Sequence, residues 1–407
     1  MKRKILVTGL GAVSAAGLTV EENIRTLSSG TSAVRPEPAL LRTRLAVPVG
    51  EVGVGNARLK ECLGIAYDVP VTRTALLALL AAREAVEDAG LDSSALSGGR
   101  TGFILGTSVG GMDLTEDFYE DFRHDCEAGG DIRMIRMHDC GASTDFVAKR
   151  LGIKGFTITV STACSSAGNA IMLGARMISA GLLDTVIAGG ADALSRFTMN
   201  GFNSLRILSA SLCRPFDISR DGLNLGEGAG FMVLQSASSL HGGSVPYCEL
   251  SGWAGTDEAY HQTGSSADGE GAFDSMSQAL EKAGLEPSMI DYVNTHGTGT
   301  PGNDLAEGTA IHRLFGAEAR YGSFKGYIGH TLAASEGIEA VFCAVMLKEN
   351  RLWPSLGFSD IDPAIGTGPY MASGEGISLK HIVSNSFGFG GNNSSLVFSK
   401  TDDSNVG

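Results

Sequence analysis

The fold is decided by Phe156-Thr157-Ile158-Thr159-Val160-Ser161-Thr162-Ala163-Cys164-Ser165-Ser166, a β-branched run that leads into a turn holding a cysteine. β-branched residues favour strands, so residues 156–160 predict a strand. The next residues, Ala167–Gly181, carry apolar side chains at helical spacing, and Thr185–Ala188 is a short apolar run that Gly189-Gly190 is expected to end. The stretch therefore predicts a strand–turn–helix–strand unit, with Cys164 at the start of the helix.

The same alternation continues on the N-terminal side of this unit. Gly9–Ser14 nearly matches a dinucleotide fingerprint, but Ser14 replaces the third glycine, so a strand-to-loop turn is the better interpretation. Glu116–Asp131 is acidic and predicts a loop. The expected elements are a strand at Ile5–Thr8 that ends in glycines, a helix at Val71–Ala89 and a strand at Thr101–Leu105.

The C-terminal part repeats this pattern. A composition shift at Gly242-Gly243-Ser244 predicts two halves, residues 1–243 and 244–407. The expected elements of the second half are a helix at Ser275–Ala283, a strand at Ile290–Asn294, a helix holding Ile338 to Met346, and strands at His381–Asn385 and Ser395–Phe398. Strands that alternate with helices in two halves predict a layered α/β fold.

The composition and net charge of the chain limit the classes of partner that it can bind. The chain has 407 residues, 43% of them hydrophobic, which is ample for a large core, and 56 glycines, which indicate close backbone contacts. Its net charge of −14 disfavours nucleic acid and anionic membranes. An acidic protein partner would also be repelled, so such a partner would have to dock on a local basic patch.

Cysteine usage and the N-terminus indicate a cytoplasmic protein. Seven cysteines without a CxxC motif indicate reduced thiols. His124-Asp125-Cys126 is echoed by His138-Asp139-Cys140, but zinc ligands usually cluster more tightly, so we expect no metal site there. The basic start is followed by an apolar run that Thr8–Gly11 interrupts, and no stretch reaches about 18 apolar residues. The sequence thus predicts a soluble, cytoplasmic chain without a leader.

Three features could carry chemistry. A helix dipole favours the thiolate of a cysteine at its N-terminus, so we expect the pKa of Cys164 to fall below about 8.5. His296 and His330 each lie beside glycine at an element boundary, where neutral imidazoles can donate hydrogen bonds to an oxyanion. Backbone N–H groups of the Gly388–Gly391 loop could complete an oxyanion hole. A buried structural cysteine, two structural histidines and an ordinary turn remain the alternatives.

Together these motifs resemble the β-ketoacyl synthase family. Val160–Ser166 resembles its nucleophile motif, and the motifs follow one another in the family's order from about residue 3 to 400. The other matches are Pro215–Asp217, Arg220–Gly222, Gly226–Gly230, the histidine block from His296 to Glu307, the lysine–histidine block Lys325–His330 and the gate loop Asn385–Gly391.

The resemblance implies a thiolase-like, five-layered αβαβα fold of two duplicated halves, a dimer and a mechanism without a cofactor or metal. Cys164 would take an acyl group from a thioester and join it to a malonyl unit on an acyl carrier protein. His296 and His330 would stabilise the enolate formed when carbon dioxide leaves. Backbone N–H groups of Cys164 and Phe389 would hold the oxyanion. The remaining implied residues are Lys325 with Glu307 and Glu339 as support, and Phe389, Gly388, Thr298 and Thr300 at the gate and pocket.

The Cys-His-His pattern is similar to that of elongating synthases, in a fatty-acid or polyene/polyketide pathway. Three alternative interpretations remain open. The chain could be a non-catalytic subunit that sets chain length, the active half of a heterodimer with such a subunit, or a thiolase that uses coenzyme A. A non-catalytic subunit typically lacks the cysteine, and a thiolase uses a second cysteine in place of one partner.

Several residues depart from the family pattern. Asn303, Glu336, Asn392 and the acidic segment Glu116–Asp139 leave chain length and partner choice open. Asn303-Asp304 and Asn224–Glu227 are more similar to synthases of aryl-polyene pathways. For docking of the carrier protein we expect Arg206, with Arg133 and Arg136, although all three could be ordinary solvated surface.

Overall fold

The computed structural model describes residues 3–125, 129–240 and 245–401. Its main sheet has ten strands in the order β10-β9-β13-β14-β8-β1-β7-β5-β3-β4. From the centre outward, one set of five is β1 (Ile5–Val13), β7 (Gly228–Ser236), β5 (Thr185–Asp192), β3 (Thr101–Gly106) and β4 (Thr157–Val160). The other is β8 (Cys248–Asp257), β14 (Asn392–Ser399), β13 (His381–Phe387), β9 (Tyr292–Asn294) and β10 (Tyr321–Gly322).

The two sets share one topology. In each set the two pairings nearest the centre are antiparallel, and the two outer pairings are parallel. The sets meet where β1 pairs with β8 over only two residue pairs, Leu6 with Glu249 and Val7 with Cys248. The matching order confirms the predicted duplication within the fold.

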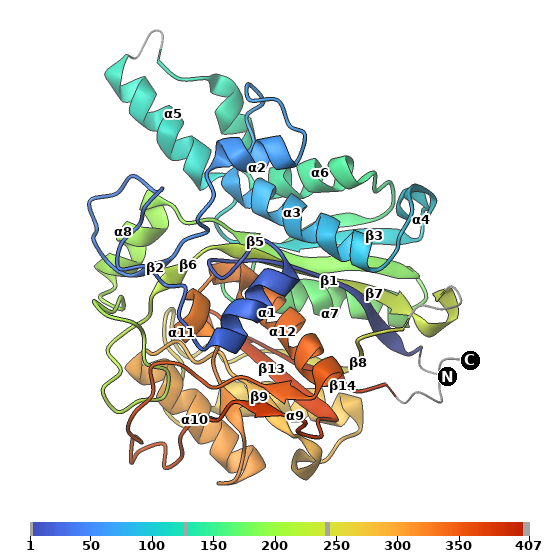
Figure 1. Ribbon diagram of the computed structural model, residues 1–407, viewed down its shortest axis with the longest axis vertical. Helices are drawn as coiled ribbons and strands as arrows, with labels where there is room; N and C mark the ends of the chain where they lie inside the picture. Colours follow the sequence, from blue (N-terminus) through green and yellow to red (C-terminus); the bar gives the residue numbers. More distant parts are fainter. Residues whose placement is uncertain (1–2, 126–128, 241–244, 402–407) are drawn as a thin grey trace.

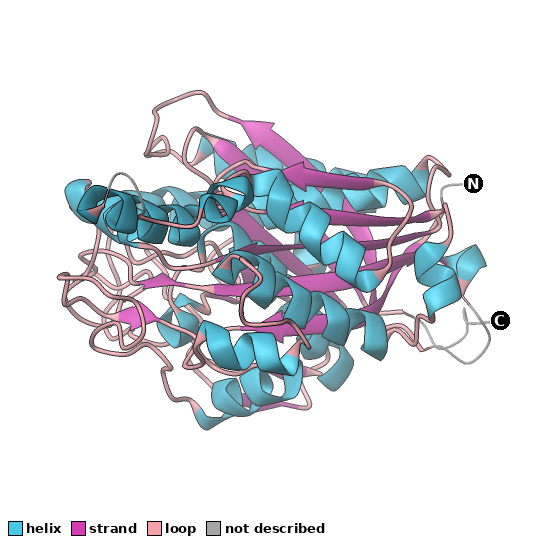
Figure 2. Ribbon diagram, turned by 90° about the horizontal axis from the view of Figure 1, so that it is seen from above, coloured by secondary structure: helices cyan, strands magenta, loops and turns pink. Residues whose placement is uncertain are grey.

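Helices cover both sets and fill the space between them, which gives five layers (Figures 1 and 2). The central layer buries apolar side chains on both of its faces, which is why α12 is apolar nearly all round. One outer layer holds α3 (Arg73–Asp88) and α6 (Cys140–Leu151), the centre holds α7 (Ser166–Ser179) and α12 (Ser335–Glu349), and the other outer layer holds α9 (Glu270–Ala283) and α10 (Pro301–Phe315). The thiolase-like αβαβα prediction is confirmed.

The remaining elements are short and lie mostly at the ends of the layers. The helices are α1 (Val20–Ser29), α2 (Asn56–Cys62), α4 (Ser93–Ser97), α5 (Met112–His124), α8 (Arg196–Ser204) and α11 (Lys325–Ile328). The 3-10 turns are η1 (Ile132–Met137), η2 (Ala237–Ser239), η3 (Pro287–Met289) and η4 (Leu332–Ala334). The two-residue strands are β2 (Val49–Gly50), β6 (Leu225–Gly226), β11 (Arg351–Leu352) and β12 (Gly374–Glu375).

Glycines do not end the strands where the sequence predicted. β1 continues through Gly9 and Gly11, and α3 packs closely on it there: a Cβ at Gly11 would lie only 1.9 Å from the carbonyl oxygen of Ala81. β5 likewise continues through Gly189 and Gly190. These glycines allow a helix or a neighbouring strand to approach the backbone closely, so they serve packing and not chain reversal.

The acidic segment predicted as a loop is largely helical. α5 covers residues 112–124 and projects from the body of the molecule (Figure 1). Arg196 at the start of α8 forms ion pairs with Glu116 at 3.2 Å and Glu120 at 2.6 Å, which offsets their repulsion. The prediction failed because this cation lies about 80 positions further along the chain.

Two predictions fall on residues outside the described chain: the seam at residues 242–244 and the part of the His124–Cys126 motif at Cys126. The division into residues 1–243 and 244–407 therefore stays a prediction. Among the described helices, none is both long enough and apolar enough to cross a bilayer.

Candidate active site

A strained turn presents Cys164 between β4 and α7. Ala163, just before it, has φ of +53°, in the left-handed region that residues with a Cβ rarely occupy. The Ser166 hydroxyl holds this turn: it donates to the Ala163 carbonyl at 2.6 Å and accepts from the Thr162 N–H at 2.9 Å. The chain thus reverses within a few residues and places the thiol at the N-terminus of α7, as the sequence predicted.

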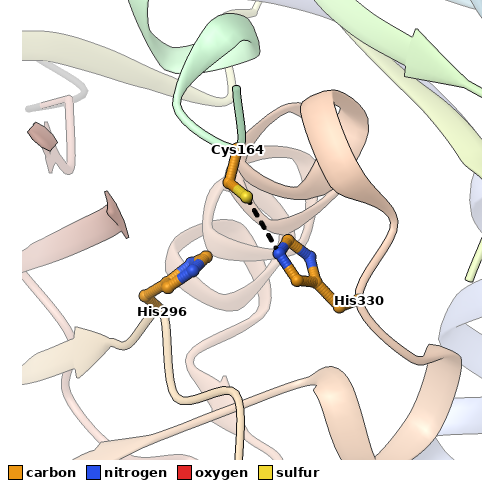
Figure 3. Close-up of side chains that lie close together, drawn as sticks. All are labelled: Cys164, His296 and His330. Carbon is orange, nitrogen blue, oxygen red and sulfur yellow. Dashed lines mark hydrogen bonds between the residues drawn. The ribbon is translucent and has the colours of Figure 1, made fainter. Parts of the chain in front are cut away.

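Cys164, His296 and His330 come together from three separate segments (Figure 3). The Cys164 Sγ lies 3.1 Å from Nε2 of His330. The centroids of the two imidazole rings are 5.1 Å apart, and the rings are nearly perpendicular. Each of the three side chains has one nitrogen or sulfur atom within 4.8 Å of those of the other two. All three residues are at most 6% exposed. The predicted cluster is therefore present, in a site largely shielded from water.

Burial sets the protonation of this cluster. It lowers the pKa of both His296 and His330 well below the usual value, and the charge of Lys325 lowers them further. Both imidazoles are therefore neutral at pH 7, as predicted. Burial also raises the pKa of the Cys164 thiol to about 12, against the lowering effects of Lys325 and the Phe389 N–H.

The expectation of a lowered thiol pKa was wrong, because loss of hydration outweighs the helix dipole and Lys325 at this depth. A thiol that stays protonated at rest must lose its proton as it attacks. The His330 Nε2 atom is already within hydrogen-bond distance to accept that proton.

The C-terminal loop contributes backbone donors. The backbone N–H groups of Phe389 and of Cys164 itself both lower the pKa of the thiol, so both lie close to the sulfur. Gly388 makes this possible, because a Cβ there would lie 2.9 Å from the Thr162 carbonyl oxygen. The Phe389 ring stacks on Phe202 of α8 at 5.7 Å between centroids. The geometry suits an oxyanion hole and a movable gate, and both roles stay predictions.

Two buried carboxylates support the cluster in different ways. Glu339 of α12 pairs with Lys325 at 2.8 Å, and both side chains are 1% exposed. Glu307 of α10 instead accepts hydrogen bonds from the backbone N–H groups of His296 and Gly297, each at 2.8 Å. Burial raises the pKa of Glu307 to about 8. Glu307 therefore positions the His296 loop, whereas Glu339 holds the lysine.

Replacing Lys325 with alanine is expected to destabilise the protein by about 3–5 kcal/mol, because it leaves the Glu339 charge buried without its partner. Chemical denaturation monitored by circular dichroism measures this. The exposed pair Arg25–Glu21 is the control, since Arg25→Ala should cost at most about 1 kcal/mol. Equal effects of the two substitutions would contradict the assigned role of Lys325.

The other predicted residues are more scattered. Thr298 is buried and its hydroxyl lies 2.9 Å from that of Thr300, and their contribution to a pocket stays a prediction. Arg206 is exposed just after α8, four residues beyond Phe202, whose ring stacks on Phe389. Arg133 and Arg136 lie exposed on η1, where Arg133 pairs with Asp131.

Comparisons with known proteins agree with this geometry. Residues 2–239 match the β-ketoacyl synthase N-terminal domain, and residues 247–359 match the C-terminal domain. A 3-oxoacyl-[acyl-carrier-protein] synthase 2 of Staphylococcus aureus is 32% identical, with 98% of each chain covered.

The chain belongs to the β-ketoacyl synthase family.

Solved structures of the family are similar over nearly the whole chain. The ishigamide ketosynthase/chain length factor has a TM-score of 0.91 at 29% identity, with 99% of this chain and 100% of the other covered. A ketosynthase in complex with its chain length factor, from Xenorhabdus doucetiae, has a TM-score of 0.86 at 31% identity, with 98% of each chain covered.

Glu336, the oddest departure from the family pattern, is wholly buried in the first turn of α12 in this β-ketoacyl synthase. It packs on the first turn of α7: a Cβ at Gly168 would lie 1.7 Å from the Glu336 Oε2 atom. Burial raises the pKa of Glu336 well above its usual value, which favours the neutral carboxyl. Gly168 thus makes room for a side chain that the family pattern does not contain.

Two polar residues near the site of this β-ketoacyl synthase were not predicted from the sequence. The Asp192 carboxylate, at the end of β5, accepts hydrogen bonds from Thr107, Ser108, Val109 and Ala333. The Ser335 hydroxyl lies 2.8 Å from Nδ1 of His330. Neither residue belongs to a motif, and a lone serine at the start of a helix gives no signal beyond capping.

Proposed function

We propose that this protein catalyses a decarboxylative Claisen condensation, which joins an acyl group on Cys164 to a malonyl unit on an acyl carrier protein. One observation carries the proposal: a thiol that contacts one neutral imidazole and lies near a second, with the backbone N–H groups of Cys164 and Phe389 close to the sulfur. A nucleophile, a proton acceptor and oxyanion donors are what acyl transfer requires.

In the first step the Cys164 sulfur attacks an acyl thioester. His330 Nε2 accepts the thiol proton and returns it to the departing thiolate of the donor, so this step takes up no proton overall. The N–H groups of Cys164 and Phe389 stabilise the oxyanion of the tetrahedral intermediate. The acyl group then remains on the enzyme as a thioester.

In the second step His296 and His330 donate hydrogen bonds to the thioester carbonyl of the malonyl unit. The malonyl carboxylate leaves as carbon dioxide, and its bonding electrons form an enolate that these two donors stabilise. The enolate carbon attacks the acyl-Cys164 carbonyl and expels the Cys164 thiolate. The thiolate takes up one proton from solvent, which restores the free enzyme.

The test mixes the purified protein with acyl-carrier and malonyl-carrier thioesters. Mass spectrometry should detect a β-ketoacyl-carrier product, with one carbon dioxide released per condensation. Cleavage of acetoacetyl-coenzyme A without condensation would instead favour the competing thiolase reaction.

Charge reversal at Arg206 should weaken turnover of malonyl-carrier protein several-fold through loss of steering, because the chain is acidic overall and this cation is exposed just after α8. Acylation of Cys164 by small coenzyme A thioesters should be unchanged in Arg206→Glu. Steady-state kinetics with both donors measures the difference. Equal loss with both donors would remove the docking role. Arg25→Glu, at an exposed arginine of α1, is the control and should leave turnover with both donors unchanged.

We further propose that the protein acts as a dimer, either with itself or with a chain-length-factor-like subunit. β4 forms an edge of the ten-stranded sheet, and the side chain of Ile158 on it is exposed. An uncovered apolar edge strand favours pairing with another chain. Two of the similar structures are described as a ketosynthase with a chain length factor. Light scattering of the protein alone, and after coexpression with such a subunit, separates the two assemblies.

Two finer proposals come from the sequence alone. A cytoplasmic location and an aryl-polyene or related polyketide pathway are both consistent with the carrier-dependent reaction. Loading a panel of saturated and polyunsaturated acyl-carrier thioesters tests the pathway. Preference for a conjugated polyene chain would support it, and preference for saturated chains would favour fatty-acid elongation.

A further inference from the structure

His330 needs opposite protonation of Nε2 in the two proposed steps. To accept the Cys164 proton, Nε2 must carry a lone pair, so the ring proton must be on Nδ1. To donate to the malonyl carbonyl, Nε2 must carry the proton, so Nδ1 must be bare. A neutral imidazole has only one ring proton, and the group that faces Nδ1 therefore decides how easily each tautomer forms.

In this protein the group that faces Nδ1 is a hydroxyl. Ser335 Oγ lies 2.8 Å from Nδ1 of His330, and the residue is 1% exposed. A hydroxyl can donate or accept, whereas a backbone carbonyl or N–H would fix one tautomer. His296 differs, since its Nδ1 lies 3.5 Å from Ser386, whose hydroxyl is already donated to the Cys164 carbonyl.

A second hydroxyl completes the chain of hydrogen bonds. Thr331 Oγ1 lies 3.3 Å from Ser335 Oγ, and Thr331 is wholly buried. When Ser335 donates to Nδ1, it can accept from Thr331; when it accepts from Nδ1–H, it can donate to Thr331. Both arrangements keep Nδ1 and the two hydroxyl oxygens in hydrogen bonds, so neither tautomer leaves Nδ1 as a buried unsatisfied polar group.

We propose that Ser335 is a positioning residue that supports His330 as Nδ1–H in the free enzyme and as Nε2–H in the acyl-enzyme. In the free enzyme the Cys164 S–H points at the lone pair of Nε2. In the acyl-enzyme that S–H is gone: the ring releases its Nδ1 proton to solvent and takes up one proton from solvent at Nε2, and the Ser335 hydroxyl turns to donate to the bare Nδ1. The inference rests on the proposed function, because it assigns both steps to His330.

Nitrogen-15 NMR of histidine-labelled protein tests the tautomers directly, with the His330 signals assigned by their loss in His330→Gln. The Nδ1 and Nε2 shifts should exchange character when Cys164 is acylated. A His330 ring that keeps the same tautomer in free and acylated protein overturns the proposal. If no thioester acylates the wild-type protein at all, the proposed function fails instead.

Kinetics of Ser335→Ala and Ser335→Thr give the second readout. Loading passes through a buried imidazolium whose Nδ1–H donates to Ser335, and a hydrogen bond to a charged group is worth more than a neutral one. Ser335→Ala should therefore slow loading about 10- to 100-fold and slow condensation from preloaded enzyme only about 3- to 10-fold.

Ser335→Thr keeps the hydroxyl and should restore most of both rates. The matched control is Ser275→Ala, which removes an equally buried serine hydroxyl that bonds only to Ser395 among the described residues. Equal loss of both steps in Ser335→Ala with no rescue by threonine, or no loss of either step, overturns the role of Ser335.

Discussion

Replacing Cys164 with alanine is expected to abolish condensation, with a fall on the order of 10⁶-fold, the scale seen when other enzymes lose a catalytic nucleophile. The acyl group then has no covalent attachment, although both imidazoles remain to polarise the malonyl thioester. Product formation by mass spectrometry, with saturating acyl-carrier and malonyl-carrier thioesters, measures the loss.

Cys248→Ala is the matched control for this substitution. Cys248 is also wholly buried, and burial also raises its thiol pKa, but it lies at the start of β8. Its removal should leave the rate of condensation nearly unchanged. Condensation that survives in Cys164→Ala, or that is lost to the same degree in Cys248→Ala, would contradict the assigned nucleophile.

Removal of either active-site imidazole is expected to slow decarboxylation about 10²- to 10³-fold, because each supplies one hydrogen bond to the developing enolate. The two variants should differ in loading. His330→Ala should also slow acylation of Cys164, since its Nε2 is the atom in contact with the thiol. His296→Ala should load at nearly the normal rate.

Carbon dioxide release from malonyl-carrier protein, measured with preloaded enzyme, isolates the decarboxylation step. Mass spectrometry of the acyl adduct follows loading separately. His381→Ala is the control, because His381 begins β13, at the end of that strand away from Cys164, and bonds to Ser399. Identical losses in both steps for His296→Ala would mean that the ring supports the fold and not the enolate.

Most of the architecture could be predicted from local patterns. The β-branched run before Cys164 and the apolar spacing after it gave β4 and α7 within two residues, because both signals depend on near neighbours. The repeated order of strands and helices indicated two halves. The pairing of β1 with β8, which joins the two sets of strands, could not be read from the sequence, since it depends on only two residue pairs.

The failures share a physical cause, which is contact between distant segments. α5 was predicted as a loop because its acidic residues lack local cations, and Arg196 supplies the charge from another helix. The thiol pKa was predicted to fall because a helix dipole is visible in the sequence, whereas the depth of burial is not. Ser335 was missed because its partner, Nδ1 of His330, is identified only by its position in space.

The identity of the cluster residues was nevertheless predictable. Each of the three lies in a short motif next to an element boundary, so the family resemblance could identify Cys164, His296 and His330 without coordinates. The packing partners around them could not be identified in this way. Glu336 beside Gly168 is an example: Glu336 departs from the family pattern, but its partner is known only from the contact between α12 and α7.

The most direct measurement is the site of acylation. The protein is incubated with a panel of acyl-carrier thioesters, its intact mass is recorded, and the adduct is located by peptide mapping among the seven cysteines. We predict a single acyl group, carried by the peptide that holds residue 164 and absent from Cys164→Ala. An adduct on any other cysteine, or none with every chain offered, would contradict the account.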